Sequence, residues 1–390
     1  MNNVSASNKA HIVVIGAGMA GLTAAQRLLA AGAAVTLVDR AKGPGGRATT
    51  LEHDGFFLNQ GPHALYVGGA GYKIFNELGI APAGSQPKPK RSMLFKAGRE
   101  YDMPISPGTI LSTNIFSVGE KVEWTALMVT LGRCDLASLK SVSLDDWLAK
   151  EVKSENVRDV FKAMVRLSTY SNCSSLFSAA AAIRQLLLVQ TDGVIYLDHG
   201  WQSIVDAMHS LVEGKAVEIY EADVSAVRPT KNGVEVVING EIRRFDAAIL
   251  ALPPRVAVKL LEGALPLEDA TEIDGIHAIH AACLDICLKN LPVADNTFGI
   301  GVDVPTYYSV HSTTAKLTEF GHVVHLAYYL KEGEKGDARH ERILLDLMDR
   351  IQPDWREALV YKRYMPNLVS SYGTALAAKN GTSGLADVTL

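Results

Sequence analysis

Length, composition and charge place this chain among ordinary globular proteins. Of its 390 residues 48% are hydrophobic and 21% charged, which suggests about two or three hydrophobic cores. Lys and Arg number 38 against 42 Asp and Glu, and the resulting formal charge of -4 gives no positive field that would favour nucleic acid.

Cysteine usage and hydropathy narrow the class further. The sequence has no CxxC pair that would suggest a metal or thiol-exchange site. Its four scattered cysteines do not form a disulfide framework, so we expect the protein in a reducing cytoplasm. These cysteines are Cys134, Cys173, Cys283 and Cys287. No apolar run approaches the roughly 18 residues that cross a bilayer. We therefore expect no membrane span, which leaves peripheral contact open.

The first 39 residues have the pattern of a βαβ unit. Residues 11–15 form a short β-branched run that predicts a buried parallel strand, and a glycine turn follows it. Residues 19–31 predict a helix that ends near Gly32. Residues 34–38 predict a second strand, which is closed by Asp39.

The turn of this unit reads GAGMAG, and each of its glycines has a separate predicted role. Gly16 makes the sharp turn, Gly18 lets the backbone approach a pyrophosphate, and Gly21 lets the helix pack close to the strands. The helix directs its free N–H groups at the phosphates, with Met19 and Ala20 contributing backbone. The sequence therefore predicts a dinucleotide site rather than an empty structural βαβ unit.

An acidic residue completes this fingerprint. Asp39 follows Gly16 at the distance, about 20 residues, at which a carboxylate binds a ribose hydroxyl. The loop that follows contains paired glycines, which permit close backbone approach at Gly46, and Arg47, which can form a forked contact with phosphate.

The GGR element, followed by Thr49, Gly55 and the segment 59–63, resembles the flavin-containing amine oxidase and phytoene desaturase superfamily, which includes protoporphyrinogen oxidase. This resemblance implies FAD as the cofactor. It also implies that Asp39 binds the adenosine ribose with Arg40 beside it, and that Arg47 reaches the pyrophosphate or flavin side. Residues 61–64 would run beside the isoalloxazine. The expected FAD contacts are Gly16, Gly18, Met19, Ala20, Gly21, Asp39, Arg40, Gly46, Arg47, Gly61, Pro62, His63 and Ala64, with the backbone of Val224 meeting the adenine.

Patterns farther along the chain predict the remaining elements. Residues 198–202 resemble the start of the superfamily's glycine-led helix, and Ser143 suits the N-cap of a helix over 144–149. The other expected elements are hairpins over 88–107 and 233–245, strands within 216–227 and 281–324, a buried strand over 247–252, and helices near 125–131, 177–188 and 339–351.

Together these elements predict an α/β fold, in which a Rossmann-like FAD-binding domain with a parallel central sheet is interleaved with an α+β substrate domain. The expected FAD-binding parts are 1–84, 197–262 and a return at 365–390, and the expected substrate-domain parts are 85–196 and 263–364. Members of the resembled superfamily end with a Gly-Asp flavin-binding element. The closing TSGLADVTL lacks it, so we expect a shortened form or an omitted end, with weakened FAD retention.

The resemblance implies an oxidoreductase that passes hydride from a substrate carbon to flavin N5. The alanine- and leucine-rich substrate segments suggest an apolar small molecule, such as a polyene or a cyclic amine. No catalytic base can be assigned among Lys162, His199 and His311, and no metal site is predicted. A flavin-dependent isomerase or mutase, and a non-enzymatic lipid- or prenyl-binding protein on the same scaffold, remain as alternatives.

Overall fold

The computed structural model describes residues 9–266, 273, 276–373 and 377. The chain divides into two compact units, each built from two separate stretches of sequence. Unit 1 comprises Met1–Thr50 and Trp201–Ile276, and unit 2 comprises Leu51–Gly200 and His277–Leu390. The predicted boundaries of the FAD-binding and substrate domains stay predictions.

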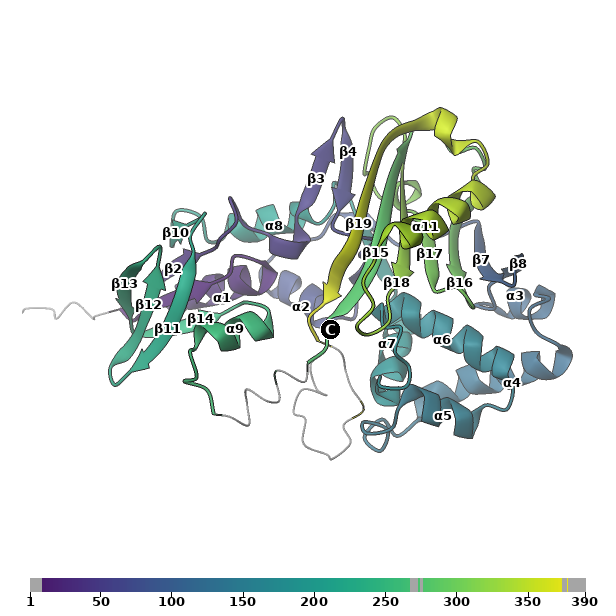
Figure 1. Ribbon diagram of the computed structural model, residues 1–390, viewed down its shortest axis with the longest axis horizontal. Coiled ribbons are helices and arrows are strands. Elements are labelled where there is room, and N and C mark those ends of the chain that lie inside the picture. The colour runs from purple at the N-terminus through teal and green to yellow at the C-terminus, as the bar shows by residue number, and fades with distance from the viewer. Residues whose placement is uncertain (1–8, 267–272, 274–275, 374–376, 378–390) are drawn as a thin grey trace, which may run out of the picture. The chain divides into compact units, whose positions relative to one another are not determined.

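Unit 1 contains a parallel four-stranded sheet, as the βαβ pattern predicts. The strand order is β10 (Val217–Ile219), β2 (Ala34–Val38), β1 (His11–Ile15) and β14 (Ala247–Leu250). Helix α1 (Met19–Ala30) connects β1 to β2 and lies against these two strands (Figure 1), and its buried residues include Leu22 and Ala25. The expected α/β fold is confirmed.

One strand of this sheet differs from the prediction. Residues 247–252 were expected to form a buried strand, but β14 ends at Leu250, and Ile249 is 37% exposed. The reason is topological, because among the described residues β14 is hydrogen-bonded only to β1 and stands last in the sheet order. Its apolar sequence therefore belongs to an edge strand.

The described remainder of unit 1 includes an antiparallel sheet and two α-helices. The predicted hairpin is confirmed, with Asn239 and Gly240 both at positive φ in its turn, 52° and 81°. Its valines pack in a core with residues of β1 and β2. These elements are β11 (Val224–Thr230), β12 (Gly233–Ile238), β13 (Glu241–Phe245), α8 (Gln202–His209) and α9 (Pro254–Leu260).

Unit 2 is built on a seven-stranded sheet, most of whose neighbouring strands are antiparallel. Its order is β19 (Leu359–Ser371), β15 (Ile279–Leu288), β18 (His322–Tyr329), β17 (Thr306–Val310), β16 (Asn296–Gly301), β7 (Arg91–Lys96) and β8 (Arg99–Asp102). The hairpin expected around Gly98 forms β7 and β8. Strand β15 is the buried strand predicted for Cys283 and Cys287, both fully buried.

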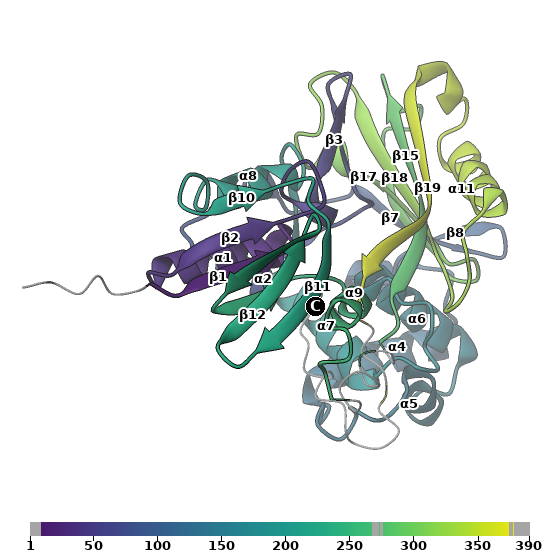
Figure 2. The same cartoon turned by 60° about the vertical axis from the view of Figure 1, so that its left-hand side comes forward.

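Helices cover both faces of this sheet. Helix α11 (Ala338–Ile351) packs its apolar stripe on one face, against side chains such as Leu284 and Leu326 (Figure 2). A helical group packs on the residues that alternate with these, including Ala281 and Ala327 (Figure 1). This group consists of α4 (Val118–Thr130), α5 (Leu144–Glu151), α6 (Glu155–Thr169) and α7 (Ala179–Asp192).

The remaining elements of unit 2 are short. Ser143 caps α5 by accepting a hydrogen bond from the backbone N–H of Asp146, as predicted.

The short elements of unit 2 are β3 (Thr50–His53), β4 (Phe56–Asn59), β5 (Leu65–Tyr66), α2 (Ala70–Glu77), β6 (Gly84–Ser85), α3 (Pro107–Ser112) and β9 (Val194–Leu197). The closing TSGLADVTL, on which the expectation of a shortened end rests, lies outside the described residues.

Candidate functional site: a glycine cradle and a second anchored segment

The glycine turn between β1 and α1 is closed by packing at two of its three glycines. Gly16 has a φ of 107°, and a Cβ atom there would lie 2.4 Å from the carbonyl oxygen of Ala251. A Cβ atom at Gly21 would lie 1.7 Å from the carbonyl oxygen of Gly16. Both positions therefore require glycine for the fold itself.

Gly18 stands in a different environment. It precedes α1 with an extended backbone, φ −74° and ψ −177°, and its nearest neighbour for an added Cβ atom is the Gly45 carbonyl oxygen at 3.9 Å. No side chain of the described residues fills the space in front of this turn within 4 Å of that position. An added side chain at Gly18 would therefore enter open space, and the fold itself does not require glycine here.

The start of α1 points its backbone donors at this space. The helix has no side-chain hydrogen bond at its N-cap, so its first N–H groups receive no cap from Gly18. Met19 is half-buried and Ala20 exposed, and the contribution of their backbone to phosphate binding stays a prediction. Such a helix end binds anions through N–H groups and its partial positive charge.

Asp39 is held at the side of the turn by two backbone donors. Its Oδ2 accepts from the N–H of Ala17 at 2.6 Å, and its Oδ1 accepts from Ala41 at 2.8 Å. The carboxylate is half-buried and fixed in orientation. Its remaining lone pairs suit the hydroxyl groups of a ribose, because each carboxylate oxygen accepts more than one hydrogen bond.

Two further predicted contacts lie beside Asp39 in unit 1. The N–H of Ala222 donates to the Asp39 carbonyl oxygen at 3.0 Å. Strand β11 begins two residues later, at Val224. Arg40 is exposed directly after Asp39. The chain is therefore hydrogen-bonded to Asp39 two residues before Val224, although Asp39 and Val224 lie 185 residues apart in the sequence.

The GPGGR loop lies along the glycine turn. Gly45 donates to the carbonyl oxygen of Ala17 at 2.8 Å and forms a parallel bridge with Gly18. A Cβ atom at Gly46 would lie 3.6 Å from the Cα of Gly18, and Arg47 is exposed. Two bare backbones thus line one space, and the residue that follows them, Arg47, carries the guanidinium that is predicted to bind an anion.

The predicted isoalloxazine segment belongs to unit 2. Gly61 has a φ of 87°, and a Cβ atom there would lie 2.4 Å from Cδ2 of Leu368. The Pro62 carbonyl oxygen accepts a hydrogen bond from the Tyr170 hydroxyl. His63 and Ala64 are half-buried. This segment is held by side chains, in contrast to the glycine turn.

The three open candidates for a catalytic base have different surroundings. Lys162 forms an ion pair with Asp145 at 3.2 Å, and His199 is exposed. His311 is buried, stacks on Tyr196 with ring centroids 3.8 Å apart, and bonds to the hydroxyl of Tyr307 at 3.0 Å. Burial, with smaller effects from two other histidines, lowers the pKa of His311 well below its usual value, so the ring stays neutral.

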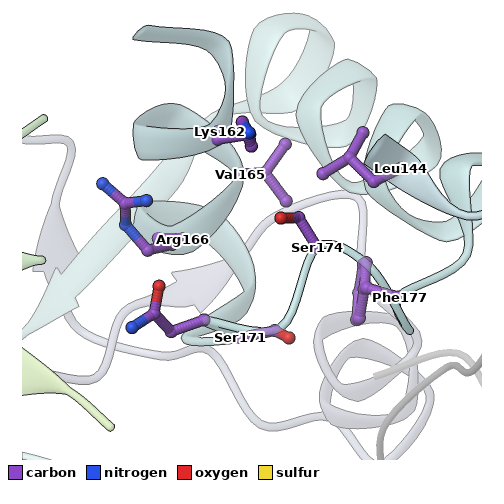
Figure 3. A pocket seen from close by; sticks show the side chains of 8 residues that line it. Leu144, Lys162, Val165, Arg166, Ser171, Ser174 and Phe177 are labelled. Carbon is purple, nitrogen blue, oxygen red and sulfur yellow. The ribbon is translucent and has the colours of Figure 1, made fainter. Parts of the chain in front are cut away.

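Lys162 also lines a small cavity in the helical group, with Val165 and Arg166 of α6 on one side and Phe177 on the other (Figure 3). The cavity volume is about 10 Å³, which is the size of a single water. This cavity is too small for an organic substrate.

Sequence reasoning missed a buried polar group in unit 2. Asp285 and His325 are fully buried, and Arg363 contacts Asp285 at 2.5 Å. The available signal was the charged Asp285 inside the apolar run AACLDICL, since a charge in a buried strand requires a partner. Among the described residues, no cluster of His, Cys, Asp and Glu is arranged to hold a metal.

Comparison with known proteins places this geometry in a family. The sequence profile of the flavin-containing amine oxidoreductases matches residues 19–353, most of the chain. The chain belongs to this family. The expected superfamily is thereby confirmed, and FAD is confirmed as the cofactor. The open space at Gly18 and the carboxylate of Asp39, which two backbone N–H groups hold in place, fit this cofactor.

Curated relatives match over parts of their length. A coproporphyrinogen III oxidase of Propionibacterium freudenreichii subsp. freudenreichii is 36% identical over 112 residues, 27% of this chain and 20% of the relative. A 4,4'-diapophytoene desaturase of Staphylococcus haemolyticus is 24% identical over 299 residues, 66% of this chain and 58% of the relative. The chain thus matches less than two thirds of the length of either relative.

Solved structures share the fold at low identity. An oxidoreductase from Methanosarcina mazei superposes with a TM-score of 0.73 at 16% identity, covering 93% of this chain and 90% of the other. Cyclohexylamine oxidase from Brevibacterium oxydans superposes with a TM-score of 0.71 at 18% identity, covering 92% and 84%.

Proposed function

We propose that this chain is an FAD-dependent oxidoreductase that removes a hydride from a carbon of an apolar small molecule. The observation that carries this proposal is the open space at Gly18, lined by two bare backbones and the start of a helix. Bound FAD supplies the hydride acceptor at flavin N5. The protein supplies binding, orientation and exclusion of water.

Unit 1 would hold the ADP half of FAD. The N–H groups at the start of α1, the loop at Gly46 and the guanidinium of Arg47 would bind the pyrophosphate. Asp39 and Val224 would hold the adenosine, the first through its carboxylate and the second through its backbone. In unit 2, residues 61–64 would lie beside the isoalloxazine.

The apolar substrate class is supported by the relatives and by unit 2. A relative is named a desaturase of a diapophytoene, and another a phytoene dehydrogenase from Streptomyces griseus. The sheet face that packs on α6 and α7 carries small and aromatic side chains, including Ala281, Ala327 and Tyr329. No helix in the described ranges has the length and apolar character to cross a membrane. We retain the cytoplasm as the proposed location on cysteine usage.

The deciding experiment is the visible spectrum of the purified chain and of Gly18→Val. Wild type should show flavin bands near 375 and 450 nm, roughly as any oxidised flavin does. Gly18→Val should lose them, because its side chain fills the pyrophosphate space. Gly119→Val serves as a matched control, since that glycine has open space around it in α4 and stands outside the cradle.

Three results would each contradict part of the proposal. Full colour in Gly18→Val would remove the glycine turn from the site. A wild-type chain that binds no FAD would favour the non-enzymatic binding protein. Anaerobic turnover of a substrate with an unchanged flavin spectrum would favour the isomerase or mutase.

A further inference from the structure

A row of polar side chains crosses four strands of the seven-stranded sheet. Asp285 on β15 is the register partner of Arg363 on β19 and of His325 on β18, and His325 is the partner of Ser309 on β17. Asp285 and His325 are fully buried, and the Arg363 side chain is 14% exposed. By strand alternation the row lies on the face opposite α11.

The row is closely connected. Arg363 donates to Oδ2 of Asp285 from Nε at 2.9 Å and from Nη2 at 2.5 Å. Nδ1 of His325 lies 2.6 Å from Oδ1 of Asp285. Arginine and aspartate are residues of opposite charge, and the short Nδ1–Oδ1 contact fits a histidine that donates from Nδ1.

Stability alone does not explain this arrangement. A buried ion pair is often no more stabilising than apolar side chains of the same size. Nε2 of His325 is also buried without a hydrogen-bond partner among the described residues, which is unfavourable because the buried atom has lost its hydrogen bonds to water. The presence of these buried polar residues therefore needs an explanation other than the stability of the sheet.

That explanation lies at the outer end of the row. Nη2 of Arg363 also donates to the Asn59 carbonyl oxygen, which accepts from the N–H of Gly61 at 2.9 Å as well. Leu368, on the same strand as Arg363, lies close under Gly61. Strand β19 thus supports the turn that starts at Asn59 by a hydrogen bond and by packing.

We propose that Arg363 is the positioning residue of the flavin-side segment, and that Asp285 and His325 serve to hold its guanidinium on the Asn59 carbonyl. The inference rests on the proposed function, in which residues 61–64 lie beside the isoalloxazine. Arginine is required because one planar guanidinium serves two acceptors at once, which the point charge of a lysine does less well.

The groups that face the polar row carry no charge, so they do not compete with the ion pair between Asp285 and Arg363. Ser309 faces it from β17, and the His311 ring lies 4.6 Å from that of His325 and is kept neutral by burial, which lowers its pKa. Burial raises the pKa of the Cys283 and Cys287 thiols on β15, so both stay protonated.

The test compares FAD binding in three variants. Arg363→Met combined with Asp285→Asn removes both charges together, so no unpaired charge stays buried. Arg363→Lys keeps the charge and loses the fork. Lys362→Met is the matched control, because it removes the neighbouring cation on β19, which pairs with Glu341 on α11 at 2.5 Å and not with the row.

Three quantities are measured for each variant. They are the affinity of the apoprotein for FAD, the visible circular dichroism of the bound flavin, and the melting temperature of the apoprotein. We expect the double variant to melt near wild type and to bind FAD about tenfold more weakly, with an altered flavin dichroism. Arg363→Lys should fall between, and Lys362→Met should match wild type in all three.

Wild-type affinity and dichroism in a folded double variant would overturn the inference while leaving the proposed function in place. Should the double variant fail to fold, Arg363→Lys decides, and wild-type behaviour there overturns the inference. A wild-type chain without FAD binding overturns the proposed function first and this inference with it.

Discussion

Each unit contains one of the predicted cofactor-binding segments, and the two segments are held in place by opposite means. In unit 1 the space at Gly18 is lined by backbone from residues close in the sequence, and the absence of a side chain keeps it open. In unit 2 the turn at Asn59 is held by the side chains of Tyr170 and Arg363, the second of them 304 residues away. A backbone site depends on local sequence, and a side-chain site depends on the completed sheet.

This difference also decides how each unit handles charge. Unit 1 offers peptide N–H groups and a half-buried carboxylate at an open surface, where solvent lowers the cost of charge. Unit 2 buries Asp285 completely and must pair it at once with Arg363 and His325. The unit 1 site is therefore sensitive to added volume, and the unit 2 site to removed partners.

The largest expected effect concerns packing in unit 2. Trp124 is fully buried and donates from Nε1 to the Pro104 carbonyl oxygen at 3.0 Å. Trp124→Ala should lower the free energy of unfolding by about 3–5 kcal/mol, measured by urea denaturation. Val118→Ala on the same helix should stay within about 0.5 kcal/mol, because Val118 is 81% exposed. Equal losses in the two variants would contradict the described core of unit 2.

The next effect separates the two kinds of glycine in unit 1. Gly21→Ala should cost about 1–3 kcal/mol of unfolding free energy and also abolish FAD binding, because its Cβ would lie 1.7 Å from the Gly16 carbonyl oxygen. Gly18→Ala should keep nearly wild-type stability and still weaken FAD binding. Stability is followed by thermal unfolding of apoprotein and binding by flavin fluorescence. If Gly18→Ala lost as much stability as Gly21→Ala, the space at Gly18 would not be open.

A smaller effect is the response of unit 2 to acid. Because burial lowers the pKa of His311 in the folded state, the unfolded chain binds more protons below a pH of about 6.5. Stability is fully present above that pH and falls below it, by up to about 1.4 kcal/mol for each pH unit. His311→Phe, which keeps a ring against Tyr196, should flatten this slope between pH 7 and 5. Burial also lowers the pKa of His322, which leaves a residual slope of the same sign.

A slope as steep in His311→Phe as in wild type would assign the acid sensitivity to other groups. Melting temperatures at pH 8 provide the reference, because both forms of the protein then carry a neutral residue at this position.

How far the sequence could predict the site follows from the same contrast. Gly16, Gly18, Gly21 and Asp39 are separated by short, fixed intervals, so their spacing alone predicts the turn that the structure shows. Asp285, His325 and Arg363 meet only through the register of three strands, and no spacing in the sequence encodes that register.

Strand β14 shows the same limit from the other side. Its composition predicts a strand, yet its burial depends on whether another strand pairs beyond it. The residues 247–250 are enough to predict that this segment is a strand, because the type of a secondary-structure element depends on local sequence. Position in the sheet depends on the whole chain.

The smallest expected effect probes how closed the sheet face of unit 2 is. Burial raises the pKa of Cys287 to about 12, so at pH 8 only about one molecule in 10⁴ carries the reactive thiolate. Cys134 is partly exposed and should react first with a disulfide reagent in the folded protein, while Cys287 should react only after denaturant is added. Cys134→Ser identifies the fast phase, and mass spectrometry locates the label. Equally fast labelling of Cys287 in folded protein would show that the face carrying the polar row opens to solvent, and Arg363 would then hold Asn59 only part of the time.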